Sequence, residues 1–97
     1  MQDYVTGVIK SYRNRSLRDF WTKGRTRGIN PQWIAKLNVR MAALSVARTP
    51  EDMNLPGYHF HGLQGVDRYS VRVTHNYRLT FAWDGEDAIE VDLEDYH

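Results

Sequence analysis

The chain has 97 residues and no cysteine, which suits one domain and excludes disulfides, thiolate nucleophiles and Cys-ligated zinc. No stretch of about 18 apolar residues occurs, and the opening MQDYVTGVIK lacks the features of a signal peptide, so we expect a cytoplasmic protein without a membrane span. The net charge of +1 divides unevenly: residues 1–48 carry ten Lys and Arg against two acids, and residues 49–97 carry three Arg against ten acids.

The first predicted element is a short strand at Val8–Tyr12, and residues 1–7 show no pattern, so we expect a loose extension of a single domain over residues 1–97. A helix should follow, because Ser16 can act as its N-cap and Asp19 lies three residues later, as in a capping box. Its apolar face should consist of Leu17, Phe20 and Trp21. The glycines expected to end the helix are Gly24 and Gly28.

A second helix has a clearer start. Asn30 can cap it and Pro31 suits its first position, where a missing N–H costs nothing. The helix should end near Arg48, before Pro50. The core stripe predicted by the 3-4-3 spacing is Ile34, Leu37, Met41 and Leu44.

The second half of the chain alternates apolar and polar residues with period 2, which is typical of half-buried strands. Turns are expected at His75-Asn76 and at Asp84-Gly85. In the last strand Ile89, Val91 and Leu93 should share the apolar face. A longer strand would place Asp95 and His97 on that face too, so the strand should end near Leu93 or Glu94. The predicted strand segments span 58–61, 69–74, 77–83 and 88–94.

These elements predict an α+β fold: a short N-terminal strand, two helices, then an antiparallel meander sheet. The helices should pack on the apolar face of the sheet. The opposite face should then carry Arg72, Arg78 and Thr80 together with the acids of the last strand.

The side chains expected on that polar face are of the types needed for metal-free cleavage of RNA. His61 has the parity of the polar face, and the closing Asp95-Tyr96-His97 leaves the neighbouring strand. The ribose 2′-OH is itself the nucleophile, so the protein needs only a base, an acid and fixed positive charge. Imidazoles can act as acid or base near neutrality, and Arg78 or Arg72 can bind the phosphate.

Each of these residues also has a simpler interpretation. His61 could be an idle surface residue, or could bind a metal with His59, although no third ligand is evident. Arg78 could pair with Glu90 or Asp92 of the last strand. Tyr96 could cap the sheet edge, His97 could be a frayed terminus, and His75 suits a turn.

Several segments together resemble HigB-type toxins of the RelE/ParE toxin superfamily. They are VIKSYRNRSLRDFW with TKGRTRGI, RMAALSVARTPEDMNLPGYHFHGLQG, VTHNYRLTF and the final EDYH, so the resemblance spans residues 8–97. It implies a RelE-like α+β toxin of a type II toxin–antitoxin system, an endoribonuclease that cuts mRNA on the ribosome and needs no cofactor. It also implies a helix-turn-helix, HigA-like antitoxin, with operator DNA bound only through the toxin–antitoxin complex.

The resemblance assigns catalytic residues one by one. The family's histidine in His-x-Leu-x-Gly falls on His61, the arginine of Asn-aromatic-Arg falls on Arg78, and the closing trio falls on Asp95, Tyr96 and His97. The family often has Pro and Lys where this chain has Gly62 and Gln64, which removes one cation from the site.

The basic half of the chain suggests a polyanion partner, although the same charges could simply be solvated surface. With the resemblance, that partner would be ribosomal RNA, bound by sequence-independent phosphate contacts. The RNA-binding candidates are Lys10, Arg13, Arg15, Arg18, Lys23, Arg25 and Arg27, with Arg72 on the sheet face.

Two other functions fit the same fold. A ParE-like protein would poison DNA gyrase and cut no RNA, and a small RNA- or protein-binding module would use the basic half while its histidines stayed idle. The pairing of His61 with the terminal Asp-Tyr-His favours RNA cleavage, because a gyrase inhibitor needs no acid–base pair.

Overall fold

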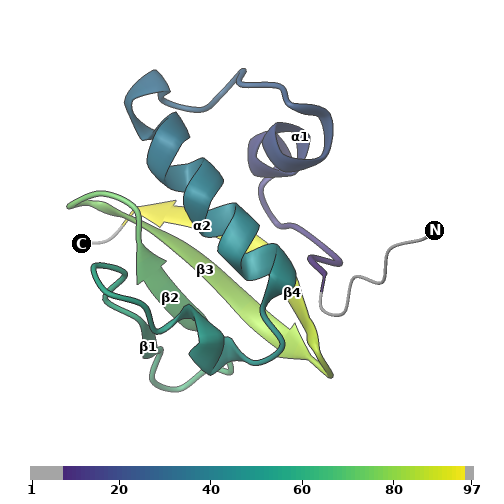
Figure 1. The fold of residues 1–97 in the computed structure, drawn as a ribbon, viewed down its shortest axis with the longest axis vertical. Coiled ribbons are helices and arrows are strands. Elements are labelled where there is room, and N and C mark those ends of the chain that lie inside the picture. Colours follow the sequence, from purple (N-terminus) through teal and green to yellow (C-terminus); the bar gives the residue numbers. More distant parts are fainter. Residues whose placement is uncertain (1–7, 96–97) are drawn as a thin grey trace.

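A computed structural model describes residues 8–95; the predicted loose extension at 1–7 and the candidates Tyr96 and His97 lie outside the described residues. Within 8–95 two α-helices precede a four-stranded antiparallel sheet of order β1-β2-β3-β4, with both helices on one face (Figure 1). The predicted α+β fold is confirmed. The elements are α1 Arg15–Lys23, η1 Pro31–Trp33, α2 Ile34–Val46, η2 Pro50–Met53, β1 His61–Gly62, β2 Tyr69–Arg72, β3 Tyr77–Asp84 and β4 Asp87–Asp95.

The N-terminal segment runs beside β4 but is not a continuous strand. Ile9 and Tyr12 form isolated parallel bridges to Ala88 and Val91. A bulge in β4 lies between these two bridges and interrupts the ladder, so the strand predicted at Val8–Tyr12 is reduced to two points of pairing.

Helix α1 is capped by a different residue from the one predicted. The side chain of Asn14, not of Ser16, accepts a hydrogen bond from the Leu17 N–H at 2.9 Å. Asn and Ser are both good N-caps, so the sequence allows the helix to begin after either Asn14 or Ser16. Gly24 ends the helix in the left-handed conformation, with φ 69°, as predicted.

Helix α2 follows the predicted start and stops slightly early. Asn30 caps a 3₁₀ turn by accepting from the Gln32 N–H, and Pro31 is its first residue. The α-helix then runs from Ile34 to Val46, two residues short of the predicted end near Arg48. Within residues 8–95 no helix is both long and apolar enough to cross a bilayer.

The core lies between the helices and the sheet. Leu17 of α1 and the stripe of α2 face the apolar residues of β2, β3 and β4. Burial of this apolar surface is what holds the helices on the sheet. The fully buried side chains include Leu17, Leu37, Met41, Leu44, Val71, Leu79, Phe81 and Val91.

Strand β4 contains a bulge that the alternation did not predict. Ile89 pairs with Ala82 and Asp92 pairs with Thr80, so two residues of β4 oppose one residue of β3. Ile89 therefore shares the face of Ala82, opposite to Val91 and Leu93, and its predicted place with them was wrong. The strand also continues through Asp95, which pairs with Tyr77, beyond the predicted end.

Candidate active site

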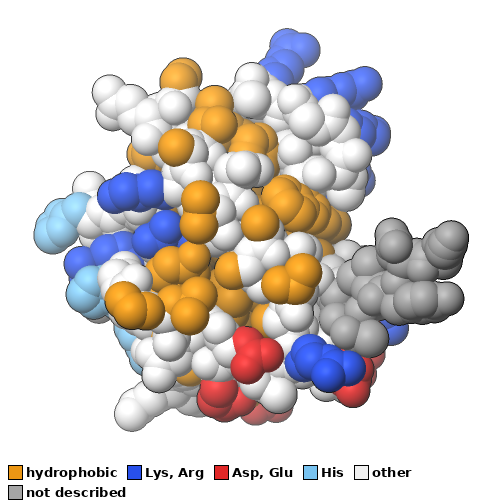
Figure 2. All heavy atoms as spheres, viewed as in Figure 1, with side chains coloured by type: hydrophobic (Ala, Val, Ile, Leu, Met, Phe, Trp, Pro, Cys, Tyr) orange, Lys and Arg blue, Asp and Glu red, His pale blue; other side chains and the backbone are white. Residues whose placement is uncertain are grey.

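The face of the sheet away from the helices carries two rows of polar residues. Register places His61, Ser70, Thr80 and Asp92 side by side across the four strands. The next row contains Arg72, Arg78 and Glu94, again on adjacent strands. His61, Arg72 and Arg78 therefore share this face, as the alternation predicted. On the side drawn in Figure 2, histidine side chains lie beside Lys and Arg at the edge occupied by β1 and β2.

Ser70 joins two of the candidate catalytic residues. Its side chain is fully buried, and Nη1 of Arg78 donates to its Oγ at 3.3 Å. The same Oγ lies 3.4 Å from Nε2 of His61. Because a guanidinium can only donate, Ser70 accepts from Arg78, and its own O–H remains available to donate a hydrogen bond to the imidazole nitrogen. A buried serine thus links the histidine of β1 to the arginine of β3.

A small pocket of about 80 Å³ opens next to this link. It is lined by Arg78, itself only 7% exposed, and by Glu94 and Asp95 at the end of β4. Glu94 pairs with Arg78 and shares its face, whereas Asp95 pairs with Tyr77 and has the parity of the opposite face. Thr80 forms part of the wall and donates its hydroxyl proton to Glu94. Leu63 closes the loop side, held by a hydrogen bond from its N–H to the Arg68 carbonyl at 2.8 Å.

The other two histidines lie elsewhere in the architecture. His59 precedes β1 and has a left-handed backbone, with φ 50°, and His75 lies in the turn between β2 and β3. Both are exposed. Among residues 8–95 no three His, Cys, Asp or Glu side chains gather as a metal ion would require.

Four residues of this face were not singled out as site residues from the sequence. Alternation had placed Thr80 and the acids of the last strand on this face without giving them a role, and Ser70 has the same polar parity in its strand. Arg68 precedes β2 in a loop without periodicity, and only its burial in the folded chain, at 8% exposed, reveals it.

Arg72 lies on the polar face of the sheet, opposite Arg78, and the other proposed RNA-binding cations fall into two groups. Lys10 and Arg13 pair with carboxylates of β4, Asp87 at 3.1 Å and Glu90 at 2.8 Å. The side-chain hydrogen bond and charge of Lys10, with the Val8 N–H, lower the pKa of Asp87. These two cations are therefore partly neutralised within the fold.

The second group surrounds a hollow of about 680 Å³ at the start of α1. Arg15, Arg25 and Arg27 line it, and Asp19 is the acid among them. Burial alone would raise the pKa of Asp19, but the hydrogen bond and charge of Arg18, with Lys23 and Arg25 nearby, bring it below its usual range. Figure 2 shows this group of Lys and Arg near α1, separate from the histidine edge.

The two faces together define a class of protein. One side of a small α+β domain carries a pocket lined by Arg78, Glu94 and Asp95, and Ser70 links Arg78 to the imidazole of His61. Exposed cations lie around the start of α1. This arrangement suits binding of a polyanion and acid–base chemistry at phosphate. It fits the small RelE-like toxins.

Comparison with known proteins gives the family. A sequence model described as the RelE-like toxin of type II toxin–antitoxin system HigB matches residues 10–97. Endoribonuclease HigB of Proteus vulgaris is 34% identical over 93 residues, an alignment that covers 93% of this chain and all of that protein. The chain therefore belongs to the HigB family of RelE-like toxins. Membership of a type II toxin–antitoxin family implies an antitoxin partner.

Proposed function

We propose that this protein is a toxin that cuts mRNA on the ribosome, a ribosome-dependent endoribonuclease. The observation that carries the proposal is the pair of His61 and Arg78, linked by Ser70, beside the pocket that Arg78, Glu94 and Asp95 line. The chain is also similar along its length to an endoribonuclease of the same family. Cleavage of translated mRNA would arrest protein synthesis and growth.

The reaction needs one proton removed, one proton supplied and charge stabilised. The ribose 2′-OH loses its proton to a base and attacks the adjacent phosphorus. The bond from phosphorus to the 5′ oxygen breaks, and that oxygen takes a proton from an acid, leaving a 2′,3′-cyclic phosphate and a 5′-OH. His61 and His97 serve as the acid–base pair, because imidazoles can exchange protons near neutral pH.

The remaining residues of the site act on charge and position. Arg78 stabilises the negative charge that develops on the phosphoryl oxygens, as an oriented donor in a partly dry site can. Asp95 and Tyr96 orient the terminal imidazole and the RNA. The cations near α1 bind ribosomal RNA, and the ribosome holds the mRNA in a reactive pose.

The biological setting follows from the same proposal. The protein acts in the cytoplasm, and its antitoxin is a HigA-like helix-turn-helix protein. That antitoxin binds operator DNA, and the toxin reaches DNA only within the complex.

Primer extension on mRNA after induction, with and without ribosomes, tests the proposal. Wild-type protein should cut mRNA only when ribosomes translate it, and His61→Ala should abolish cleavage and growth arrest while remaining folded. His75→Ala, in an exposed turn, is the matched control and should cut normally. Full toxicity of His61→Ala would contradict the catalytic assignment, and intact mRNA together with DNA breaks would indicate a gyrase poison instead.

A further inference from the structure

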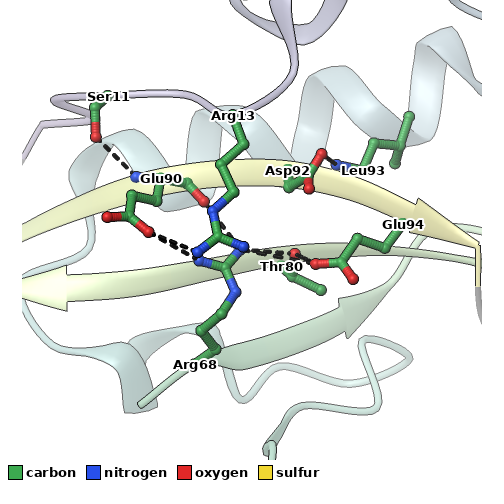
Figure 3. A network of polar contacts seen from close by, with 8 residues as sticks. All are labelled: Ser11, Arg13, Arg68, Thr80, Glu90, Asp92, Leu93 and Glu94. Carbon is green, nitrogen blue, oxygen red and sulfur yellow. Dashed lines mark hydrogen bonds and ion pairs between the residues drawn. The ribbon is translucent and has the colours of Figure 1, made fainter. Parts of the chain in front are cut away.

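Arg68 is a buried charge that the proposed chemistry does not use. Its side chain crosses from the start of β2 over β3 to β4 (Figure 3). Nη2 donates to Oγ1 of Thr80 and to the backbone carbonyl of Glu90, both at 2.9 Å. The carboxylates of Glu90 and Glu94 each lie 3.8 Å from its guanidinium. Burial, and then the charge of Arg13, lowers the pKa of Arg68, which means that keeping the charged guanidinium in this place costs free energy.

The carbonyl that Arg68 binds belongs to the bulge of β4. Glu90 has a left-handed backbone, with φ 51°, which is strained for a residue with a side chain. The N-terminal segment holds Glu90 from the other side, since Ser11 Oγ accepts from its N–H at 2.8 Å and Arg13 pairs with its carboxylate (Figure 3). Such strain persists only where neighbouring contacts fix it.

This bulge decides which face of the sheet the end of β4 presents. With the extra residue, Thr80 pairs with Asp92 and Arg78 pairs with Glu94. Without it, the register of Ile89 would carry on, and Val91 would face Thr80 while Leu93 faced Arg78. A shift of one residue moves every following side chain to the other face. Bulges are frequent beside active sites for this reason.

We propose that Arg68 is a positioning residue for the reaction: by clamping the bulge at Glu90 and the side chains of Thr80 and Glu94, it sets the register that brings Glu94, at the end of β4, to the face and pocket of Arg78. The proposal rests on the proposed function for its catalytic consequence. The clamp itself is a property of the fold and can be measured without RNA.

The first measurement is amide hydrogen exchange on Arg68→Met, which keeps the length of the side chain and removes its charge and donors. Protection should fall by about tenfold or more in residues 92–94, after the bulge, and stay unchanged in residues 87–89 before it. Arg48→Met is the matched control, because it removes the same side chain from an exposed position just beyond the end of α2, outside the contacts that hold Glu90. Equal protection along β4 in Arg68→Met and wild type would overturn the clamp.

The second measurement is single-turnover cleavage on programmed ribosomes, with ribosome affinity measured separately. Arg68→Met should lower the cleavage rate at saturation by about 10- to 100-fold with affinity unchanged, because misplacement of the end of β4 affects orientation and not docking. Arg68→Lys should recover part of the rate, and Thr80→Val should lose rate in the same way if Arg68→Met fails to fold. Wild-type rates in both Arg68→Met and Thr80→Val would refute the catalytic consequence.

The two measurements separate the two ideas. A wild-type protein that cuts no RNA contradicts the proposed function, while loss of protection in residues 92–94 of Arg68→Met would still support the clamp. A wild-type protein that cuts RNA, with unaltered exchange and rate in Arg68→Met, contradicts the positioning role and leaves the proposed function intact.

Discussion

The hydroxyl oxygen of Ser70 lies 3.4 Å from Nε2 of His61, and the two residues are direct partners across β1 and β2. Because Ser70 accepts from Arg78, its own O–H remains available to donate to Nε2, and we predict that His61 carries its proton on Nδ1. We predict that Ser70→Ala lowers cleavage by about 10- to 100-fold, since the histidine loses its orienting partner. Imidazole ¹⁵N spectra should show a shift toward the Nε2-protonated tautomer.

Ser45→Ala is the control for that substitution, because its hydroxyl bonds to the Ala42 carbonyl on α2, away from the polar face. It should leave both the cleavage rate and the His61 tautomer unchanged. An unaltered tautomer in Ser70→Ala would mean that the serine only fills space between β1 and β3.

Arg78→Lys should separate charge from geometry at the pocket. Lysine keeps the positive charge but loses the planar fork that donates to Ser70 and to phosphate together. We predict a fall in cleavage rate on the order of 100-fold, with ribosome affinity retained, as for loss of one oriented donor to a developing oxyanion. Single-turnover cleavage and a separate binding assay measure the two effects. Equal loss of affinity and rate would instead assign Arg78 to docking.

The sequence predicted elements wherever a local rule had a single solution. Gly24, the first of two glycines expected to end α1, does end it, and Asn30 before Pro31 was the clear start of the second helical segment. Alternation placed His61 and Arg78 on one face because β1 to β3 pair without an interruption.

Prediction failed where the outcome depended on distant contacts. The alternation of Glu90 to Glu94 is as regular with a bulge as without one, so only the pairing with β3 reveals the extra residue. That error put Ile89 on the wrong face. Arg68 left no local signal, because its partners lie 12 and 22 residues further along the chain.

Gly28 should tolerate a side chain less well than Gly24, although both have positive φ, 84° and 69°. A Cβ at Gly28 would overlap the hydroxyl oxygen of Ser16 and lie 3.1 Å from its Cβ, whereas a Cβ at Gly24 meets nothing within 4 Å. We predict that Gly24→Ala costs about 1 kcal/mol of unfolding free energy from backbone strain alone. Gly28→Ala should cost a further 1–3 kcal/mol or so from the overlap.

Urea unfolding of the two alanine variants measures this difference, since each carries the same substitution at a similar backbone angle. Adding Ser16→Gly to Gly28→Ala should recover most of the extra loss by removing the atoms that overlap. Equal losses at the two glycines would show that the loop after α1 adjusts without cost.

Asp52 should make stability depend on pH in the acid range. Its carboxylate accepts from the backbone N–H groups of Arg48 and Thr49, at 2.9 and 3.3 Å, and these bonds lower its pKa. A carboxyl with a lower pKa in the folded state stabilises the fold above its unfolded pKa and loses that contribution as the pH falls through the folded pKa. Unfolding free energy should therefore decline below about pH 4.

Asp52→Asn removes the titrating group and keeps an acceptor, so its stability should decline less steeply over that range than that of the wild type. Urea unfolding between about pH 6 and pH 2 gives both curves. Glu51→Gln, the exposed neighbour in the same turn, is the control and should follow the wild-type curve. Parallel curves for Asp52→Asn and the wild type would show that the capping carboxylate does not contribute to acid unfolding.

The cations around the hollow of α1 should contribute more to ribosome binding than those beside β4. Arg25 and Arg27 share that hollow with a single acid, whereas Lys10 and Arg13 each pair with a carboxylate of β4. The doubles Arg25→Gln/Arg27→Gln and Lys10→Gln/Arg13→Gln remove the same charge from exposed sites. Only the first should weaken binding strongly and reduce the slope of log affinity against log salt by up to about 2. Matching losses would mean that the β4 ion pairs open on the ribosome at little cost, because an exposed pair contributes only about 1 kcal/mol or less.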